Sequence, residues 1–353
     1  MKADFDGMEK ARREYLERIR SLSPPQFDPA KWEELRRLVY FPRHLKLDVV
    51  IDDTTLREGL QMAGLTSPIP ENACRIACML RDIGVERLEV LTYTKSDQEA
   101  VEMMKDNGLG DILAAWCRAA KEDIDIALKM GFKQVGISHP VSYIHFEKWM
   151  DAGLGKLVER VVDAVEYAAE HGLAVFVHGE DSTRADWGFE RTFVNAVAEA
   201  GALVYRICDT VGCGLSDPQA PLPSGIPTKV RQMKKETKIP YIEIHAHDDL
   251  GNAVENTMAA IRAASGLYEK VYASTTFLGI GDRAGNAETE KVILNCYLHH
   301  DIDKWNMKPL RELAVFMASS INYHLPLNKA IVGDAAFAHE SGIHVHGVST
   351  LPL

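Results

Sequence analysis

Two segments far apart in the chain contain residue types that bind metal ions. Glu243, His245 and His247 occupy alternate positions of one segment. A β-strand points alternate side chains to one face, so all three would face the same way and two imidazoles could meet one cation. Arg57 and Glu58, which follow an apolar strand-like run, would add a carboxylate ligand beside a permanent positive charge. The His-x-His pattern by itself is equally typical of two ordinary strand histidines.

Two further motifs favour the metal site. A glycine-rich segment, residues 274–287, contains Gly279, Gly281, Gly285 and Asn286, and a histidine-rich segment covers residues 336–347. Together with the first two segments, these motifs resemble the metal-dependent acyl-CoA Claisen-condensing enzymes. That family comprises the isopropylmalate, homocitrate and citramalate synthases and is related to hydroxymethylglutaryl-CoA lyase. The resemblance extends over about residues 46–348.

The resemblance implies an acyltransferase that condenses acetyl-CoA with a 2-oxo acid to a 2-substituted malate and free CoA. A lyase that cleaves a carbon–carbon bond is the rival enzyme class. Hydroxymethylglutaryl-CoA lyases carry a cysteine in the glycine-rich loop, and the stretch from Gly279 to Asn286 has none. A non-enzymatic protein that only binds acyl-CoA or a partner is the third possibility, and it is disfavoured because every metal and base position is filled.

A Claisen condensation needs stabilisation of the negative charge that develops on the attacked ketone oxygen, which a divalent cation and a guanidinium can supply. We therefore expect Glu58, His245 and His247 to bind a metal ion and Arg57 to donate to the developing alkoxide. The resemblance places Asn286 close to the metal, with a loop-capping amide as its alternative role. Zn, Mn, Mg and Co all suit such a ligand set.

In the resembling enzymes the general base is a histidine that corresponds to His344 and reaches into the barrel of a neighbouring subunit. The resemblance therefore implies a homodimer with an exchanged C-terminal tail, and we expect Glu243 to orient this histidine. The alternative is an interfacial histidine without a catalytic role. His339 and His346 are weaker candidates for the base.

Substrate contacts are expected from the inward faces of the other strands. Phe176, His178 and Glu180 would share one face, and so would residues 206, 208 and 210. The predicted substrate contacts are Gln61, Glu89, His178, Arg206 and Thr210, with Glu180 close to the reacting groups. A buried structural carboxylate is the alternative role for each acid.

The chain departs from the homocitrate synthases, which carry an arginine at the position of Phe176 and a serine at that of His178. Arg206 stands where the family usually has a small or amide side chain, and arginine suits bidentate binding of a carboxylate or phosphonate. We therefore expect an acceptor with an anionic tail, such as phosphonopyruvate, oxaloacetate or 2-oxoglutarate. The alternatives are an aliphatic acceptor in a pocket lined by Phe176 and Leu91, and an exposed Arg206 paired with a barrel acid.

Strand-like apolar runs alternate with helical periodicity along the chain. The predicted strands cover residues 48–53, 87–92, 112–117, 134–138, 174–178, 203–208, 241–246 and 270–275. Eight such units predict an α/β fold of the (β/α)8 TIM-barrel type over residues 46–302, with an N-terminal helical extension (1–45) and a C-terminal helical tail (303–353). A doubly wound sheet is the rival, but it would not gather motifs from the first, fifth, sixth and seventh strands into one site.

Composition is consistent with a large cytoplasmic enzyme. The chain has 353 residues, of which 46% are apolar and 26% charged, and its net charge of -11 argues against nucleic acid or an anionic membrane as a partner. No apolar stretch is long enough to span a bilayer, and the N-terminus lacks the apolar core of a signal peptide. The six cysteines show no zinc-knuckle spacing and are expected to be reduced.

Overall fold

The computed structural model describes residues 5–22, 28–146 and 153–350. The chain divides into two compact units. The barrel unit consists of Leu45–Leu294 and Lys304–Leu325. The second unit consists of the described residues of Met1–His44, Asn295–Asp303 and Pro326–Leu353. Residues 304–325 thus belong to the barrel unit, although the sequence analysis grouped them with the C-terminal tail.

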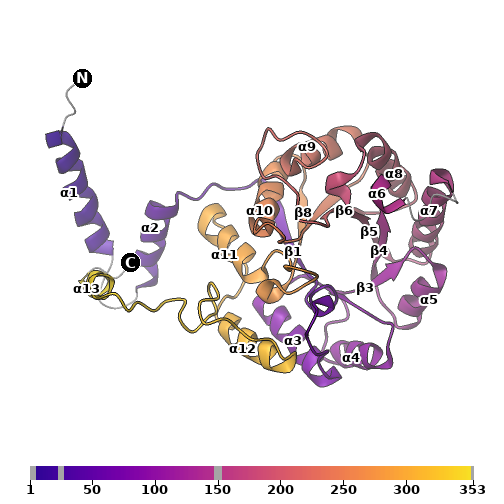
Figure 1. The fold of residues 1–353 in the computed structure, drawn as a ribbon, viewed down its shortest axis with the longest axis horizontal. Helices are drawn as coiled ribbons and strands as arrows, with labels where there is room; N and C mark the ends of the chain where they lie inside the picture. Colours follow the sequence, from indigo (N-terminus) through magenta and orange to yellow (C-terminus); the bar gives the residue numbers. More distant parts are fainter. Residues whose placement is uncertain (1–4, 23–27, 147–152, 351–353) are drawn as a thin grey trace. The chain divides into compact units, whose positions relative to one another are not determined.

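The barrel unit contains a closed barrel of eight parallel strands that follow one another around the barrel in chain order. Figure 1 looks into this barrel and shows helices around its outside. The strands are β1 (Asp48–Asp53), β2 (Arg87–Val90), β3 (Leu113–Arg118), β4 (Gln134–Pro140), β5 (Ala174–Glu180), β6 (Val204–Asp209), β7 (Tyr241–Ala246) and β8 (Lys270–Thr275). The predicted TIM barrel is confirmed.

Hydrophobic patterning located the strands to within two residues at each end. The strand β2 ends two residues earlier than predicted, and β4 and β5 end two residues later, where pairing continues through His139 with Gly179 and Pro140 with Glu180. This extension carries polar residues, so it lacks the apolar pattern that signals a strand. Because of this extension, Glu180 is the last residue of β5 and not part of the loop that follows.

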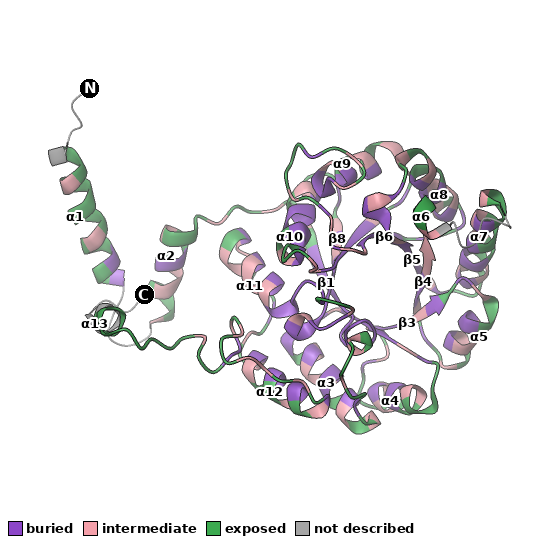
Figure 2. Cartoon of the chain, viewed as in Figure 1, coloured by how far each residue is buried: buried purple, intermediate pink, exposed green. Residues whose placement is uncertain are grey.

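Helices surround the barrel, and most of them bury one face, as the purple and green sides in Figure 2 show. They are α3 (Pro70–Ile83), α4 (Lys95–Asp106), α5 (Lys121–Lys129), α6 (Tyr143–Phe146), α7 (Leu154–Glu170), α8 (Trp187–Glu199), α9 (Ile226–Glu236), α10 (Ala253–Ala264), α11 (Thr289–His300) and α12 (Leu310–Ser320). Local sequence sets several ends. A capping box between Thr94 and Asp97 begins α4, and Gly84, at a φ of 105°, ends α3.

The inside of the barrel is charged. TIM barrels usually fill this space with branched apolar side chains. Here Asp52, Arg87, Glu89, Arg206 and Glu243 are all at most 1% exposed. Buried charges of this kind are tolerated only when they are paired, so the interior must be an ion-pair network.

The second unit contains α1 (Phe5–Leu22), α2 (Pro29–Tyr40) and α13 (Gly342–Thr350). Ile19, Leu22 and Leu35 form a small apolar core between α1 and α2. The predicted general base, His344, lies in α13 and is exposed. Across both units, no described helix is long and apolar enough to cross a membrane.

Candidate active site

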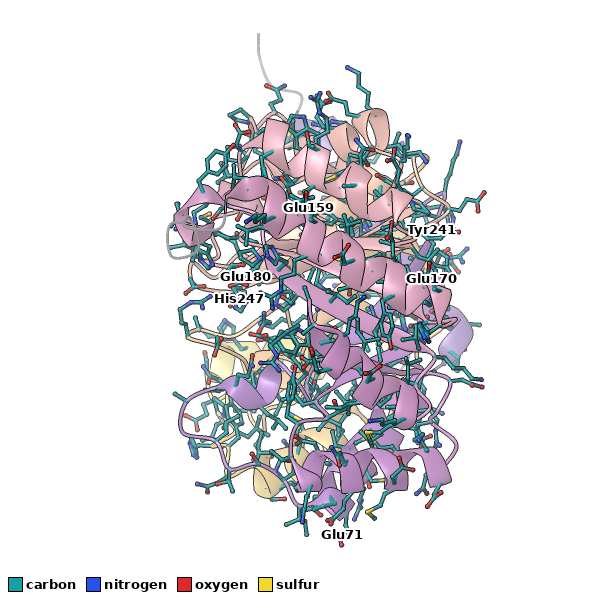
Figure 3. All side chains as sticks on the ribbon, turned by 90° about the vertical axis from the view of Figure 1, so that its right-hand side faces the viewer. Glu71, Glu159, Glu170, Glu180, Tyr241 and His247 are labelled. Atoms are coloured by element: carbon teal, nitrogen blue, oxygen red, sulfur yellow. The ribbon has the colours of Figure 1, made fainter. Side chains whose placement is uncertain are left out.

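A pocket of about 170 Å³ lies where the strands of the barrel end. In Figure 3, Glu180 and His247 lie together at this end, and Tyr241, the first residue of β7, lies toward the other. The pocket is lined by these predicted site residues: Arg57, Glu58, Gln61, His178, Glu180, Arg206, Thr210, His245 and His247. Because side chains alternate along each strand, residues two apart on β5, β6 and β7 face it together.

Glu58, His245 and His247 form a three-residue cluster at the base of this pocket. One ligand atom from each lies within 4.8 Å of the other two, and all three side chains are buried. His245 Nδ1 lies 2.9 Å from the hydroxyl oxygen of Ser274. If Nδ1 carries the proton and donates it to Ser274, the Nε2 lone pair is left for a metal ion, as is typical of metal-ligating histidines.

Asn286 lies beside this cluster. Its amide nitrogen is 3.4 Å from His245 Nε2, and its Oδ1 is buried without a hydrogen-bond partner. A Cβ on residue 281 would lie 2.0 Å from that oxygen, so a glycine is required there. His247 Nδ1 is also buried and unpartnered. A divalent cation would satisfy such groups, so the residues fit the predicted metal ion.

Burial sets the protonation state of the two histidines. It lowers the pKa of His245 well below its usual value and the pKa of His247 to about 4. Both imidazoles are therefore neutral near pH 7, which is the form that binds a metal ion.

Arg57 lies between the metal cluster and the barrel interior. Its Nη1 donates to Glu58, and its Nε donates to Glu89 Oε1 at 2.6 Å. Burial alone would lower the pKa of Arg57, but Glu89 and Glu58 raise it. The guanidinium is thus a fixed positive charge directly beside a predicted metal ligand.

Arg206 is fully buried and is held by three carboxylates. Its Nη2 lies 2.6 Å from Asp52, 2.9 Å from Glu89 and 3.1 Å from Glu243. The alternative of an exposed Arg206 is therefore wrong, whereas the ion pair with barrel acids is present. The three carboxylates already neutralise the charge of the Arg206 guanidinium. A contact between Arg206 and an anionic acceptor tail therefore stays a prediction.

His178 fills a space that a glycine leaves open. Its Nε2 lies 3.3 Å from Glu89 Oε2, and a Cβ on Gly136 would lie 2.5 Å from the imidazole ring. Burial lowers the pKa of His178 well below its usual value. The pocket floor therefore presents a neutral imidazole that packs against Gly136 and lies beside Glu89.

Glu243 and Phe176 lie deeper in the barrel than the pocket lining. Glu243 contacts Arg206 and Arg87, and burial raises its pKa to about 8. Phe176 packs under Arg87, whose guanidinium carbon is 3.3 Å from the ring centroid. The expected role of Glu243 beside His344 stays a prediction. The alternative aliphatic pocket lined by Phe176 and Leu91 is not formed, because Leu91 lines a different cavity.

Thr210, directly after β6, and Glu180, the last residue of β5, also line the pocket. Thr210 Oγ1 accepts a hydrogen bond from the backbone N–H of Asp181 at 2.8 Å, so its own proton is available to a substrate oxygen. Glu180 is about half-buried, and burial raises its pKa. A carboxylate with a raised pKa at this place can accept a proton in the reaction.

Several pocket residues were not identified from the sequence. Trp116, Ser138 and Arg283 also line the pocket, Ser274 supports His245, and His145 contacts Glu180. Trp116 and Ser138 are the inward residues near the ends of β3 and β4, so inspecting the last inward position of every strand would have found them. No recognisable sequence motif surrounds either residue.

Comparison with known proteins identifies the family. Residues 48–317 match the family model described as HMGL-like. The chain belongs to the HMGL-like family. The resemblance drawn from the motifs is therefore confirmed.

Similar sequences are named as synthases. The chain is 37% identical to homocitrate synthase 1 of a Nostoc species, over 86% of this chain and 78% of the relative. It is 36% identical to a putative (R)-citramalate synthase of Methanothermobacter thermautotrophicus (86% and 58%), and 35% identical to a 2-isopropylmalate synthase of Methanocaldococcus jannaschii (85% and 56%). The chain thus spans little more than half the length of the last two relatives.

Solved structures share the fold at lower identity. The HMG-CoA lyase of Bacillus subtilis superposes with a TM-score of 0.65 at 17% identity, covering 80% of this chain and 97% of the lyase. An HMG-CoA lyase of Pseudomonas aeruginosa gives a TM-score of 0.65 at 18% identity, covering 83% and 97%. At such identities the likeness concerns the fold alone.

Removing a metal ligand should abolish metal binding, whereas removing a residue that only supports a ligand should weaken it. We expect His245→Ala and His247→Ala to lose stoichiometric Zn²⁺ or Mn²⁺ after dialysis, measured by elemental mass spectrometry. Ser274→Ala should weaken binding by roughly 10- to 100-fold, because it removes only the support of His245. The exposed His171→Ala is the control and should bind as the wild type does. Full metal content in both ligand variants would show that the ligand assignment is wrong.

Replacing Arg206 should destabilise the fold. Arg206→Leu leaves Asp52, Glu89 and Glu243 without their shared cation, so we expect the free energy of unfolding to fall by about 3–5 kcal/mol in a denaturant titration. Arg262→Leu is the matched control, because its partner Glu255 is exposed and the change should matter little. Equal unfolding midpoints for Arg206→Leu and the wild type would contradict the network.

Proposed function

We propose that this protein is an acyltransferase that condenses acetyl-CoA with a 2-oxo acid to give a 2-substituted malate and free CoA. The observation that carries the proposal is the buried cluster of Glu58, His245 and His247 with Arg57 at its edge, in one pocket at the strand ends. The synthase names of the relatives at 35–37% identity support the same reaction.

The residues of the pocket can perform the steps of a condensation. A base removes a proton from the acetyl methyl group, and the resulting carbanion attacks the ketone carbon of the acceptor. The alkoxide that forms takes up a proton, and water hydrolyses the thioester of the adduct to release free CoA. A divalent ion, when bound by Glu58, His245 and His247, supplies electrostatic stabilisation of the ketone oxygen. Arg57 lies where it can donate to that oxygen, and Thr210 can donate to the acceptor carboxylate.

A lyase is the second candidate, because the matching family model is described as HMGL-like and solved HMG-CoA lyases are among the structures that share the fold. Two observations favour the synthase. The sequence relatives at twice that identity are synthases. In addition, the loop from Gly279 to Asn286 lacks the cysteine that the lyases carry.

The acceptor is proposed to have a short polar tail, preferably anionic. Trp116, Ser138 and His178, on β3, β4 and β5, line the pocket from strands that lie across the barrel from β7, β8 and β1. An aliphatic tail would bury apolar surface against polar groups here and leave them unpaired. The pocket volume of about 170 Å³ also favours a small acceptor. Phosphonopyruvate and oxaloacetate fit better than 2-oxoglutarate, the longest of the three.

The acceptor preference can be measured directly. We expect acceptor-dependent CoA release, with kcat/KM higher for phosphonopyruvate or oxaloacetate than for 2-oxoisovalerate. His178→Ala should lower kcat/KM for the preferred acceptor by roughly ten- to a hundredfold, because one charge-assisted contact is lost. It should change kcat/KM for 2-oxoisovalerate little. A clear preference for 2-oxoisovalerate would defeat the polar-tail proposal, and no CoA release with any acceptor would defeat the synthase proposal.

We also propose that His344 acts as a base in the barrel of a neighbouring subunit, within a homodimer whose C-terminal tails are exchanged. Two features support this. His344 lies in a unit separate from the barrel, and its side chain is exposed rather than buried in that unit.

Subunit complementation tests the exchanged tail. Inactive His344→Ala chains mixed with inactive Arg57→Ala chains under conditions of subunit exchange should regain part of the activity, because mixed dimers contain one intact site. Mixing two different Arg57 variants, Arg57→Ala and Arg57→Gln, is the control and should restore nothing. Full activity in a verified monomer would contradict the exchanged tail.

A further inference from the structure

His145 contacts the pocket carboxylate Glu180, and no step described so far uses it. His145 lies on α6, directly after β4, and its Nδ1 is 3.3 Å from Glu180 Oε1. The His145 side chain is 32% exposed, its Nδ1 faces Glu180, and its Nε2 lies 3.9 Å from Asp181 Oδ2. The imidazole thus stands between a pocket acid and bulk water.

The placement of His145 is fixed by contacts with the end of β5. The backbone N–H of Val141 donates to the carbonyl of Glu180 at 2.9 Å, and the Ser142 hydroxyl donates to Asp181. The backbone N–H of His145 in turn donates to the carbonyl of Ser142 at 3.2 Å. The start of α6 is therefore tied to the strand end that carries Glu180.

The other charged groups around His145 leave Glu180 as its main partner. Asp181 Oδ2 is 3.9 Å from His145 Nε2, but Asp181 already binds Arg184 through two hydrogen bonds of 2.7 and 2.9 Å. The carboxylate of Asp181 is thus largely compensated. Among the contacts of the described residues, the ion-pair partner of Glu180 is His145, at 3.3 Å.

We propose that His145 is a relay residue that carries a proton between Glu180 and solvent in each turnover. This inference rests on the proposed condensation. It assigns no contact between His145 and substrate, so His145 acts through Glu180.

The proton transfer balances as follows. His344, the proposed base, takes a proton from the acetyl methyl group, the electron pair of the broken C–H bond stays on carbon to form the enolate, and the proton then passes to Glu180, where it forms an O–H bond. The proton then passes from Glu180 Oε1 to Nδ1 of a neutral His145, which becomes an imidazolium. Loss of the Nε2 proton to water leaves Glu180 as a carboxylate and a neutral ring with its proton on Nδ1, and exchange of that proton through water to Nε2 restores the starting tautomer before the next turnover. Imidazole suits this step because its ordinary pKa lies near neutrality, and burial, which raises the pKa of Glu180, helps that carboxylate to hold a proton.

The test separates a relay from a simple support of Glu180. His145→Asn keeps an N–H donor near the place of Nδ1 but cannot accept and release a proton, whereas His145→Ala leaves a space that free imidazole can enter. His171→Asn, an exposed histidine on the surface of the barrel unit, is the matched control. Thermal unfolding and metal content should be the same in all four proteins.

Two readouts are needed: steady-state CoA release, and incorporation of deuterium from D2O into the methyl group of acetyl-CoA, followed by mass spectrometry with Mg²⁺-loaded enzyme. For His145→Asn we expect kcat and the rate of deuterium incorporation to fall by roughly ten- to a hundredfold, with the KM for acetyl-CoA changed less than about twofold. Imidazole in the buffer should restore much of the activity of His145→Ala. His171→Asn should match the wild type.

Wild-type kinetics in His145→Asn would overturn the relay, because a hydrogen bond to Glu180 would then be sufficient. Failure of imidazole to restore His145→Ala would overturn it as well. Wild-type enzyme that releases no CoA with any 2-oxo acid would instead defeat the proposed function. The two failures are therefore distinguishable.

Discussion

The site depends on a network of buried ion pairs that crosses the inside of the barrel. Glu89 on β2 is its centre, because this one carboxylate accepts from both Arg57 and Arg206 and lies 3.3 Å from His178. Burial alone would raise the pKa of Glu89, but Arg206 and Arg57 hold it well below its usual value. The carboxylate is therefore charged, it fixes the guanidinium beside the metal cluster, and it lies beside the imidazole on the pocket floor.

This network explains why a barrel with few apolar groups at its centre can still form a rigid site. Each buried charge loses its hydration on folding, and only mutual pairing offsets that cost. Asp52, Glu89 and Glu243 come from three different strands and share Arg206, which comes from a fourth. Such pairing gives little net stability, but it disfavours any strand register that would separate the charges. The pocket lining is thereby held in one arrangement.

Much of the fold and part of the site could be predicted from the sequence, for physical reasons that differ from residue to residue. Strand periodicity placed His245 and His247 on one inward face, and the closed barrel then brought Glu58 to them. The partners of Arg206 could not be predicted, because pairing across the barrel depends on register and on the stagger of strands far apart in the chain. His145 was missed because a four-residue helix has too few residues for a periodic signal. The role of Gly136 could not be predicted either, because its missing side chain makes room for His178, a contact that only the structure reveals.

The central claim is that Glu58, His245 and His247 hold a divalent ion in the pocket that also contains Arg57 and Glu180. Diffraction data collected on either side of the zinc absorption edge, from crystals grown with Zn²⁺, test it most directly. The account predicts a strong anomalous peak about 2.0–2.2 Å from one atom of each of the three side chains. A fully occupied zinc site elsewhere, with this cluster empty at saturating Zn²⁺, would contradict it.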